Sequence, residues 1–165
     1  MRNLQRWQIY IANRVYVNAG VVNQMIKYFD GFYLTDEKDV ILERYEEVNN
    51  LLKNAYWAKD REVSTMWHAI ANSLNYAIFH AESKSLVGFA RVVTDYATVY
   101  YVCDVFIAEE FRCMGLGKAL VEWIVLNETK LSGVNGLLKT RDAKALYEKY
   151  GFEECKAICM VQKRK

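Results

Sequence analysis

Proline is absent from this sequence of 165 residues, so glycine, asparagine, aspartate and serine must mark the ends of its helices and strands. Long apolar runs are absent as well, since no stretch approaches the roughly 18–20 residues of a membrane-spanning helix. The apolar segment near the start, Trp7–Ala12, is too short to be the core of an export signal. We therefore expect no membrane partner and a cytoplasmic location.

A charge excess of one sign is also missing. The chain has 22 Lys and Arg against 20 Asp and Glu, mixed along its length, for a net charge of +2. A nucleic-acid-binding surface usually shows a clear basic excess, so no nucleic-acid partner is expected. Apolar residues make up 53% of the chain, which is enough for the core of one folded domain.

Metal-binding patterns are lacking too. The cysteines and histidines are Cys103, Cys113, Cys155, Cys159, His68 and His80. The cysteines form no CxxC pair and the histidines lie far from them in sequence, so no metal site is predicted and reduced thiols are expected.

Apolar spacing predicts four helices and six strands between residues 32 and 162. The helices are expected at Val40–Leu52, at 62–74 with Val63, Met66, Trp67, Ile70 and Leu74 on one face, at Lys118–Leu126, and at 143–150 with Gly151 ending it. The strands are expected at Phe32–Thr35, Ala77–Ala81, Leu86–Thr94, Tyr100–Ile107, Leu137–Lys139 and Ile158–Gln162.

The first thirty residues form an N-terminal extension that is harder to interpret. Trp7–Ala12 and Val15–Ala19 alternate well enough for a hairpin that turns at Asn13-Arg14, but a helix fits the same residues. The extension has too much apolar surface to leave in water. We expect it to pack on the domain at 31–165 or in a subunit interface, which makes a homodimer plausible.

A glycine-rich turn lies between the strand at Tyr100–Ile107 and the helix that follows. Its residues are Arg112, Cys113, Met114, Gly115, Leu116, Gly117 and Lys118. Two close glycines let backbone N–H groups converge at a helix N-terminus, where they bind phosphate.

Three phosphate-binding motifs could explain such a turn. A Walker A loop would need glycine at Arg112 and serine or threonine at Ala119, so that interpretation fails. A dinucleotide fingerprint would need a third glycine at Leu120. The remaining form, Arg/Gln-x-x-Gly-x-Gly/Ala, cradles the pyrophosphate of CoA. A tight turn that merely contains two glycines stays an alternative.

With this turn and its flanking segments, the sequence resembles the GNAT superfamily of acetyltransferases, especially small and mostly uncharacterised bacterial members. The resemblance covers residues 32–162 and includes 89–95, 103–107 and 146–152. It implies an α+β fold, in an α/β three-layer arrangement, with a GNAT-type mixed central β-sheet flanked by helices. It also implies acetyl-CoA as cosubstrate, no metal, and transfer of the acetyl group to an amine.

The resemblance assigns roles to individual residues. Val105, Phe106 and Ile107 would give backbone groups to the pantetheine arm and the acetyl carbonyl. The turn from Arg112 to Lys118 would hold the pyrophosphate, and Tyr147 would protonate the departing thiolate. Cys113 and Thr140 depart from the common family pattern, and the second puts one asparagine contact to the cofactor in doubt.

Both candidate catalytic residues could instead have a purely structural role. Asp104 interrupts an apolar strand, so it is either the base or amine anchor of the reaction, or an aspartate paired with a cation such as Arg91. Tyr147 shares a helical face with Leu146 and Tyr150, which is also compatible with a core position.

Other residues bear on the mechanism. In a regular strand Cys103 points to the face opposite Asp104, which makes an acyl-cysteine route less favoured. Tyr56, Trp57 and Tyr96 could line an acceptor pocket.

The sequence therefore predicts an N-acetyltransferase acting on a primary amine of a small molecule or peptide, by direct attack in a ternary complex. A non-catalytic CoA-binding regulatory module is one alternative. An O-acyltransferase or longer-chain acyltransferase on the same scaffold is another.

Overall fold

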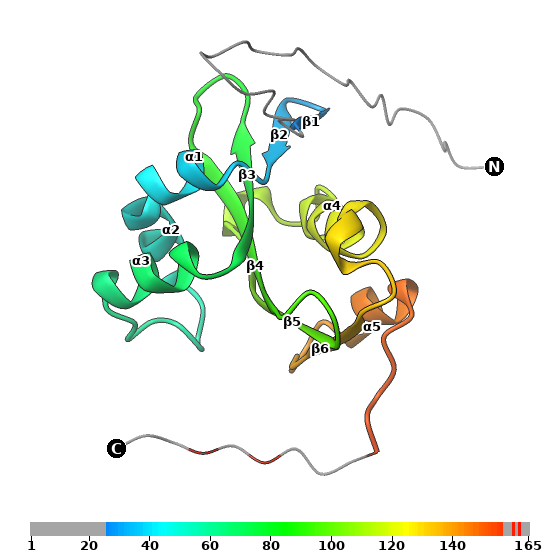
Figure 1. Ribbon diagram of the computed structural model, residues 1–165. Coiled ribbons are helices and arrows are strands. Elements are labelled where there is room, and N and C mark those ends of the chain that lie inside the picture. Colours follow the sequence, from blue (N-terminus) through cyan, green and yellow to red (C-terminus); the bar gives the residue numbers. More distant parts are fainter. Residues whose placement is uncertain (1–25, 157–159, 161, 163–165) are drawn as a thin grey trace, which may run out of the picture.

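The computed structural model of the chain describes residues 26–156, 160 and 162, and within them a six-stranded sheet runs through the molecule (Figure 1). Its strands are β1 (Ile26–Phe29), β2 (Phe32–Thr35), β3 (Leu74–His80), β4 (Leu86–Thr94), β5 (Val99–Ile107) and β6 (Asn135–Leu138), in that spatial order. Neighbours from β1 to β5 are antiparallel, whereas β5 and β6 are parallel. The predicted mixed sheet flanked by helices is confirmed.

Helices cover both faces of this sheet (Figure 1). One face carries α1 (Lys38–Glu43), α2 (Tyr45–Leu52) and α3 (Val63–Ala71), and the other carries α4 (Leu116–Glu122) and α5 (Lys144–Tyr147). Short helical turns η1 (Glu109–Phe111), η2 (Trp123–Asn127), η3 (Thr129–Leu131) and η4 (Glu148–Tyr150) join them. No helix in the described part of the chain is long and apolar enough to cross a bilayer.

Two apolar clusters, one on each face of the sheet, form the core. The cluster under α4 includes Tyr76, Ile78, Val92, Leu120 and Ile124. The cluster under α1–α3 includes Ile41, Leu52, Met66, Phe79 and Phe89. Alternate residues of β3 enter opposite clusters, as the two-residue period of a strand requires, so apolar residues pack on both faces of the sheet.

The predicted helix at Val40–Leu52 is wrong in one respect, because it consists of two helices that meet at Arg44. Arg44 donates from Nη1 to the carbonyl oxygen of Lys84 at 3.0 Å, and its guanidinium lies 4.6 Å from the ring centroid of Phe79. These contacts to the β3–β4 hairpin hold the chain where the helix direction changes.

The helical face predicted to extend to Leu74 is also shorter than expected, since α3 ends at Ala71 and Leu74 begins β3. Asn75 of β3 donates from Nδ2 to the carbonyl oxygens of Ile70 at 2.9 Å and Ser73 at 3.0 Å. The side-chain amide thus ties the last turn of α3 to the start of β3.

Most other predicted elements are present. β2 and β4 have the predicted bounds, and β5 begins one residue earlier than predicted. The helix predicted at 143–150 is α5 followed by η4, and Gly151 ends it with a φ of +81°. The sheet begins at Ile26, before the predicted domain boundary at residue 31. The segments Trp7–Ala12 and Val15–Ala19, and most of Ile158–Gln162, lie outside the described residues.

A β-bulge interrupts β5 beside the centre of the sheet. Arg91 pairs with Cys103 and Phe89 pairs with Phe106, so two residues of β5 oppose one residue of β4. Asp104 lies at this point with a φ of +55°, a conformation that costs a non-glycine residue about 1–2 kcal/mol. Such strain is typical of functional sites.

Candidate active site

The strands β5 and β6 diverge and leave a gap between them. β6 pairs with β5 only from Val99 to Val102, whereas β5 continues to Ile107. In the described part of the chain, the edge of β5 that faces β6 therefore has no partner strand beyond Val102. Backbone N–H and C=O groups there are available to a ligand.

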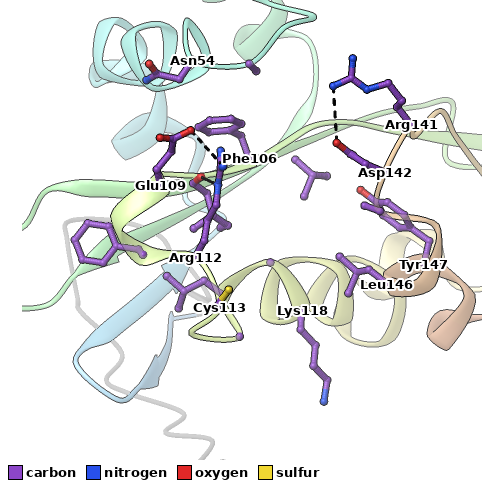
Figure 2. A pocket seen from close by; sticks show the side chains of 18 of the residues that line it. Asn54, Phe106, Glu109, Arg112, Cys113, Lys118, Arg141, Asp142, Leu146 and Tyr147 are labelled. Carbon is purple, nitrogen blue, oxygen red and sulfur yellow. Dashed lines mark hydrogen bonds and ion pairs between the residues drawn. The ribbon is translucent and has the colours of Figure 1, made fainter.

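A cavity of about 670 Å³ lies at this gap (Figure 2). It is bounded by the end of β5, the glycine-rich turn, the start of α5 and the loop after α2. Its lining includes Asn54, Tyr56, Trp57, Val105, Phe106, Ile107, Arg112, Cys113, Gly115, Leu116, Gly117, Lys118, Arg141, Asp142 and Tyr147. The cavity thus brings together most of the predicted cofactor-binding residues.

The glycine-rich turn has the conformation that an anion cradle needs. Gly115 precedes α4 with a φ of +82°, and Cys113 has a φ of +64°. The first intrahelical bond runs from the N–H of Ala119 to the carbonyl of Gly115 at 3.0 Å. The preceding N–H groups of the first turn have no intrahelical acceptor and face an incoming anion together with the positive end of the helix dipole.

Side chains around the turn differ in their contribution. Arg112 donates from Nε to the carbonyl of Ile107 at 3.2 Å, and its guanidinium lies 5.2 Å from the ring centroid of Phe106. Lys118 points away from the turn in Figure 2. Met114 is exposed and does not line the cavity, unlike the other predicted residues of the turn.

Tyr147 is buried at the wall of this cavity, on α5. Its ring packs edge-on against Phe152 at 5.9 Å between centroids, and burial together with the nearby Asp142 carboxylate raises the pKa of Tyr147 to about 12. Its hydroxyl has no hydrogen-bond partner within residues 26–156. The phenol is therefore protonated at neutral pH and can donate into the cavity.

A second cavity, of about 560 Å³, adjoins the first on the side of the bulge. Both are lined by Tyr56, Trp57, Val105, Asp142, Ala143 and Tyr147, so they meet at these residues. Tyr96, predicted as a third aromatic residue of an acceptor pocket, lies elsewhere, beside Leu74 and Lys38.

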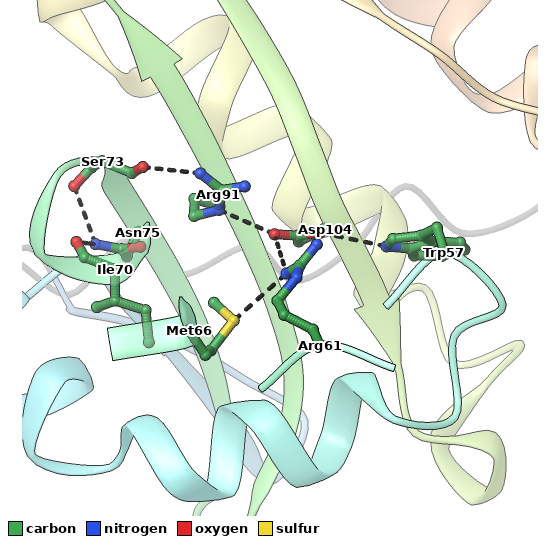
Figure 3. A network of polar contacts seen from close by, with 8 residues as sticks. All are labelled: Trp57, Arg61, Met66, Ile70, Ser73, Asn75, Arg91 and Asp104. Atoms are coloured by element: carbon green, nitrogen blue, oxygen red, sulfur yellow. Dashed lines mark hydrogen bonds and ion pairs between the residues drawn. The ribbon is translucent and has the colours of Figure 1, made fainter. Parts of the chain in front are cut away.

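Asp104 lies at the second cavity as the centre of an ion-pair network (Figure 3). Arg61 donates to both carboxylate oxygens, at 2.9 and 3.0 Å, and Arg91 donates from Nε at 2.9 Å. Trp57 adds a bond from Nε1 at 3.3 Å. Burial by itself would raise the pKa of Asp104, but the bonds from Arg61 and the charges of Arg91 and Arg61 outweigh it and lower that pKa.

This geometry supports the ion-paired interpretation of Asp104 over the base. A carboxylate held by two guanidiniums, with a lowered pKa, is a poor proton acceptor. The pairing with Arg91 was one of the two alternatives drawn from the sequence. Arg61 was not predicted, because no local pattern distinguishes an arginine just before a helix. The only signal for a second cation was the buried charge of Asp104.

The expectation that Cys103 and Asp104 point to opposite faces is wrong, because the bulge changes the alternation. Val102 and Val105 both contact the cluster under α4, so the two residues between them share the other side. Cys103 and Asp104 accordingly line the same cavity. Burial raises the pKa of the Cys103 thiol to about 11.

Asp142 and Arg141, in the loop before α5, were also missed, because they belong to no motif. The Arg141 guanidinium lies 3.9 Å from the ring centroid of Tyr56, which also lines the first cavity. It lies 3.9 Å from the Asp142 carboxylate (Figure 2). Thr140, predicted to replace a cofactor-binding asparagine, lines the second cavity and accepts from the N–H of Ala143 at 3.0 Å.

Comparison with known proteins shows the family and the fold. Residues 74–154 match the family model of the acetyltransferase (GNAT) domain. A solved structure from Xanthomonas campestris pv. campestris, assigned to the GNAT family of acetyltransferases, is 31% identical, with a TM-score of 0.68 over 78% of this chain and 89% of that one.

Two further relatives extend the comparison. The uncharacterized N-acetyltransferase ycf52 of Pyropia yezoensis is 28% identical over 129 residues, which are 75% of this chain and 71% of that protein. Glucosamine-6-phosphate N-acetyltransferase from Arabidopsis thaliana is 18% identical, with a TM-score of 0.61 over 82% of this chain and 100% of that one, and shares the fold.

Proposed function

Because this chain belongs to the GNAT family of acetyltransferases, we propose that it moves an acetyl group from acetyl-CoA to a primary amine of a small molecule or a peptide. One observation carries the proposal. The cavity beside the glycine-rich turn and the cavity beside the bulge meet at Val105 and Tyr147. Two ligands that enter from opposite sides would touch there.

The residues of the first cavity fit acetyl-CoA, which when bound supplies the thioester that carries the acetyl group. A Cβ added at Gly115 would find free space, but its φ of +82° excludes most side chains, and a Cβ at Gly117 would meet only Ile107, at 3.8 Å. The turn thus leaves room over its N–H groups for a pyrophosphate. The free edge of β5 from Val105 to Ile107 would hold the pantetheine arm by backbone hydrogen bonds.

The same strand would also promote the chemistry. A backbone N–H of β5 near Val105 would stabilise the negative charge that develops on the acetyl oxygen. The neutral amine nitrogen bonds to the acetyl carbon, the carbon–sulfur bond breaks, and the nitrogen releases one proton. Tyr147 would donate the proton that the departing sulfur takes up, and the proton released by the nitrogen, carried by solvent, would restore the phenol.

Direct attack by the amine is favoured over an acyl-cysteine route. The only cysteine at the second cavity, within the described residues, is Cys103. With a pKa of about 11, its thiol is protonated at neutral pH and is a weak nucleophile. Cys113 lies in the turn, at the other end of the first cavity from Tyr147 (Figure 2).

Asp104 has a positioning role in this proposal. Its carboxylate fixes Arg61 and Arg91 and thereby shapes the second cavity. The carboxylate that faces the junction is that of Asp142, which is largely exposed and lines both cavities. It would attract the ammonium form of an acceptor toward Tyr147.

The test is thiol release from acetyl-CoA with a panel of primary amines, combined with calorimetry of CoA binding. Binding together with amine-dependent turnover supports the proposal. Binding without turnover of any amine or alcohol would instead indicate a regulatory CoA-binding module. Turnover of alcohols alone would indicate an O-acyltransferase.

A further inference from the structure

The second cavity has an excess of positive charge. Its charged side chains are Arg61, Arg91 and Lys139 against Asp104 and Asp142. At its floor, two guanidiniums share the single carboxylate of Asp104, which is 5% exposed. The side chains of Arg61 and Arg91 are 20% and 14% exposed, so water compensates their remaining charge poorly. A bound anion would balance it.

Arg91 has an unused donor that is held in place. It donates from Nε to Asp104 at 2.9 Å and from Nη1 to the hydroxyl of Ser73 at 3.0 Å. Its Nη2 has no hydrogen-bond partner in the described part of the chain (Figure 3). A planar guanidinium fixed at two nitrogens presents the third without further loss of side-chain freedom, which favours recognition of a carboxylate or phosphate oxygen.

The opposite end of the same cavity carries a negatively charged side chain. Asp142 lies there with Tyr147, at the junction where the acetyl group would be transferred. The aromatic side chains of Tyr56 and Trp57 line the space as well. The cavity therefore offers an anion site at the bulge and, at the junction, an exposed carboxylate that is paired only at 3.9 Å with the exposed Arg141 and can attract an ammonium group.

We propose that the acceptor is a small amine that also carries an anionic group, a carboxylate or a phosphate. Its oxyanion would bind the free nitrogen of Arg91, supported by the charge of Arg61, while its amine points to Asp142 and Tyr147. This inference rests on the proposed function, since it names the class of amine that the second cavity accepts.

Matched pairs of amines test it. β-Alanine is compared with β-alaninamide, 4-aminobutyrate with its amide, and O-phosphoethanolamine with ethanolamine. The anionic member of at least one pair should have a kcat/KM about 10- to 100-fold higher, the usual range for a charge-assisted hydrogen bond. The pair with the largest ratio identifies carboxylate or phosphate as the preferred group.

Two variants separate recognition from structure. Arg91→Gln should raise KM for the preferred anionic amine by tenfold or more, and should bring the ratio of kcat/KM between that amine and its neutral partner close to one. Arg44→Gln is the control, because Arg44 also chelates a carboxylate, that of Glu47, but lies outside both cavities. It should leave the ratio between paired amines unchanged. If Arg91→Gln does not fold, competitive inhibition by propionate or inorganic phosphate in the wild type replaces it.

The outcomes distinguish this inference from the proposed function. Equal kcat/KM within every pair, or absence of competitive inhibition by both anions, would overturn the anion site while leaving the acetyltransferase intact. If no amine is acetylated, the proposed function fails. In that case the anion site is tested by calorimetry, which measures the affinity of the CoA-loaded protein for β-alanine, O-phosphoethanolamine and their neutral partners. Equal affinity within each pair would overturn the anion site.

Discussion

Substitution of Tyr147 by phenylalanine separates a catalyst from a CoA-binding module. The change removes one hydroxyl and keeps the ring, which packs 5.9 Å from Phe152. That hydroxyl faces the cavity and has no partner within residues 26–156, so its loss removes no internal hydrogen bond. The free energy of unfolding should therefore fall by no more than about 0.5 kcal/mol, or rise.

The effect on rate follows from the position and the pKa of the phenol. A general acid contributes typically 10²- to 10⁴-fold, and a thiolate is a tolerable leaving group without help, so we expect the chemical step to slow by about 10- to 10³-fold. Because the pKa of Tyr147 is raised to about 12, the phenol keeps its proton across the working range. The ratio between wild type and variant should accordingly be constant from about pH 6 to 10.

The assay is single-turnover acetyl transfer to a competent amine, with melting temperatures and CoA affinity measured alongside. Tyr150→Phe is a matched control, since Tyr150 follows on the same helical segment, has a pKa also raised to about 12 and lines neither cavity. It should react at the wild-type rate. Equal rates for Tyr147→Phe and wild type would falsify the acid role and return Tyr147 to the core. A descending limb near pH 9–10 that disappears in Tyr147→Phe would contradict the raised pKa.

Three further predictions concern the turn, the ion-pair network and the cysteine. Gly115→Val should weaken CoA binding at least tenfold, because valine at a φ of +82° is strained and distorts the cradle, whereas Gly133→Val, equally strained at +77° but outside both cavities, should leave CoA affinity unchanged in calorimetry. Asp104→Asn should lower the melting temperature by several degrees, because it removes the partner of two buried guanidiniums. The kcat for neutral amines should stay within a few fold of wild type. A decrease in kcat of about 10²-fold would instead indicate that Asp104 is the base. Pairing lowers the pKa of Asp104 below its ordinary 3.8. Its contribution to stability is therefore present above that pH and is lost as the pH falls through the lowered pKa. The difference in the free energy of unfolding between wild type and Asp104→Asn should accordingly become smaller below about pH 4. Cys103→Ala should retain turnover, and trapping of acetylated protein in wild type but not in this variant would show an acyl-cysteine route.

Local patterns were enough to predict the scaffold and the position of the glycine-rich turn. A strand, two close glycines and a helix follow one another in sequence, and the left-handed conformation of Gly115 depends only on neighbouring dihedral angles. Likewise, runs of β-favouring residues predicted β2 and β4 at their observed bounds.

Predictions from local sequence patterns were wrong where segments that are distant in the sequence meet. Alternation placed Cys103 and Asp104 on opposite faces, because a bulge leaves no mark in a run of β-favouring residues. The base role drawn for Asp104 depended on an unpaired carboxylate, and Arg61, 43 residues away, supplies the decisive partner.

The sequence by itself therefore determined the fold, the family and the position of the glycine-rich turn, since these depend on short-range periodicity and turn geometry. Only the tertiary structure decided what surrounds Asp104, on which side Cys103 lies, and that the two cavities join at Tyr147. The physical reason is that charge balance, burial and pKa depend on which side chains approach through space. Arg61 before α3, Arg91 on β4 and Asp142 before α5 reach the same cavity only after the sheet has formed.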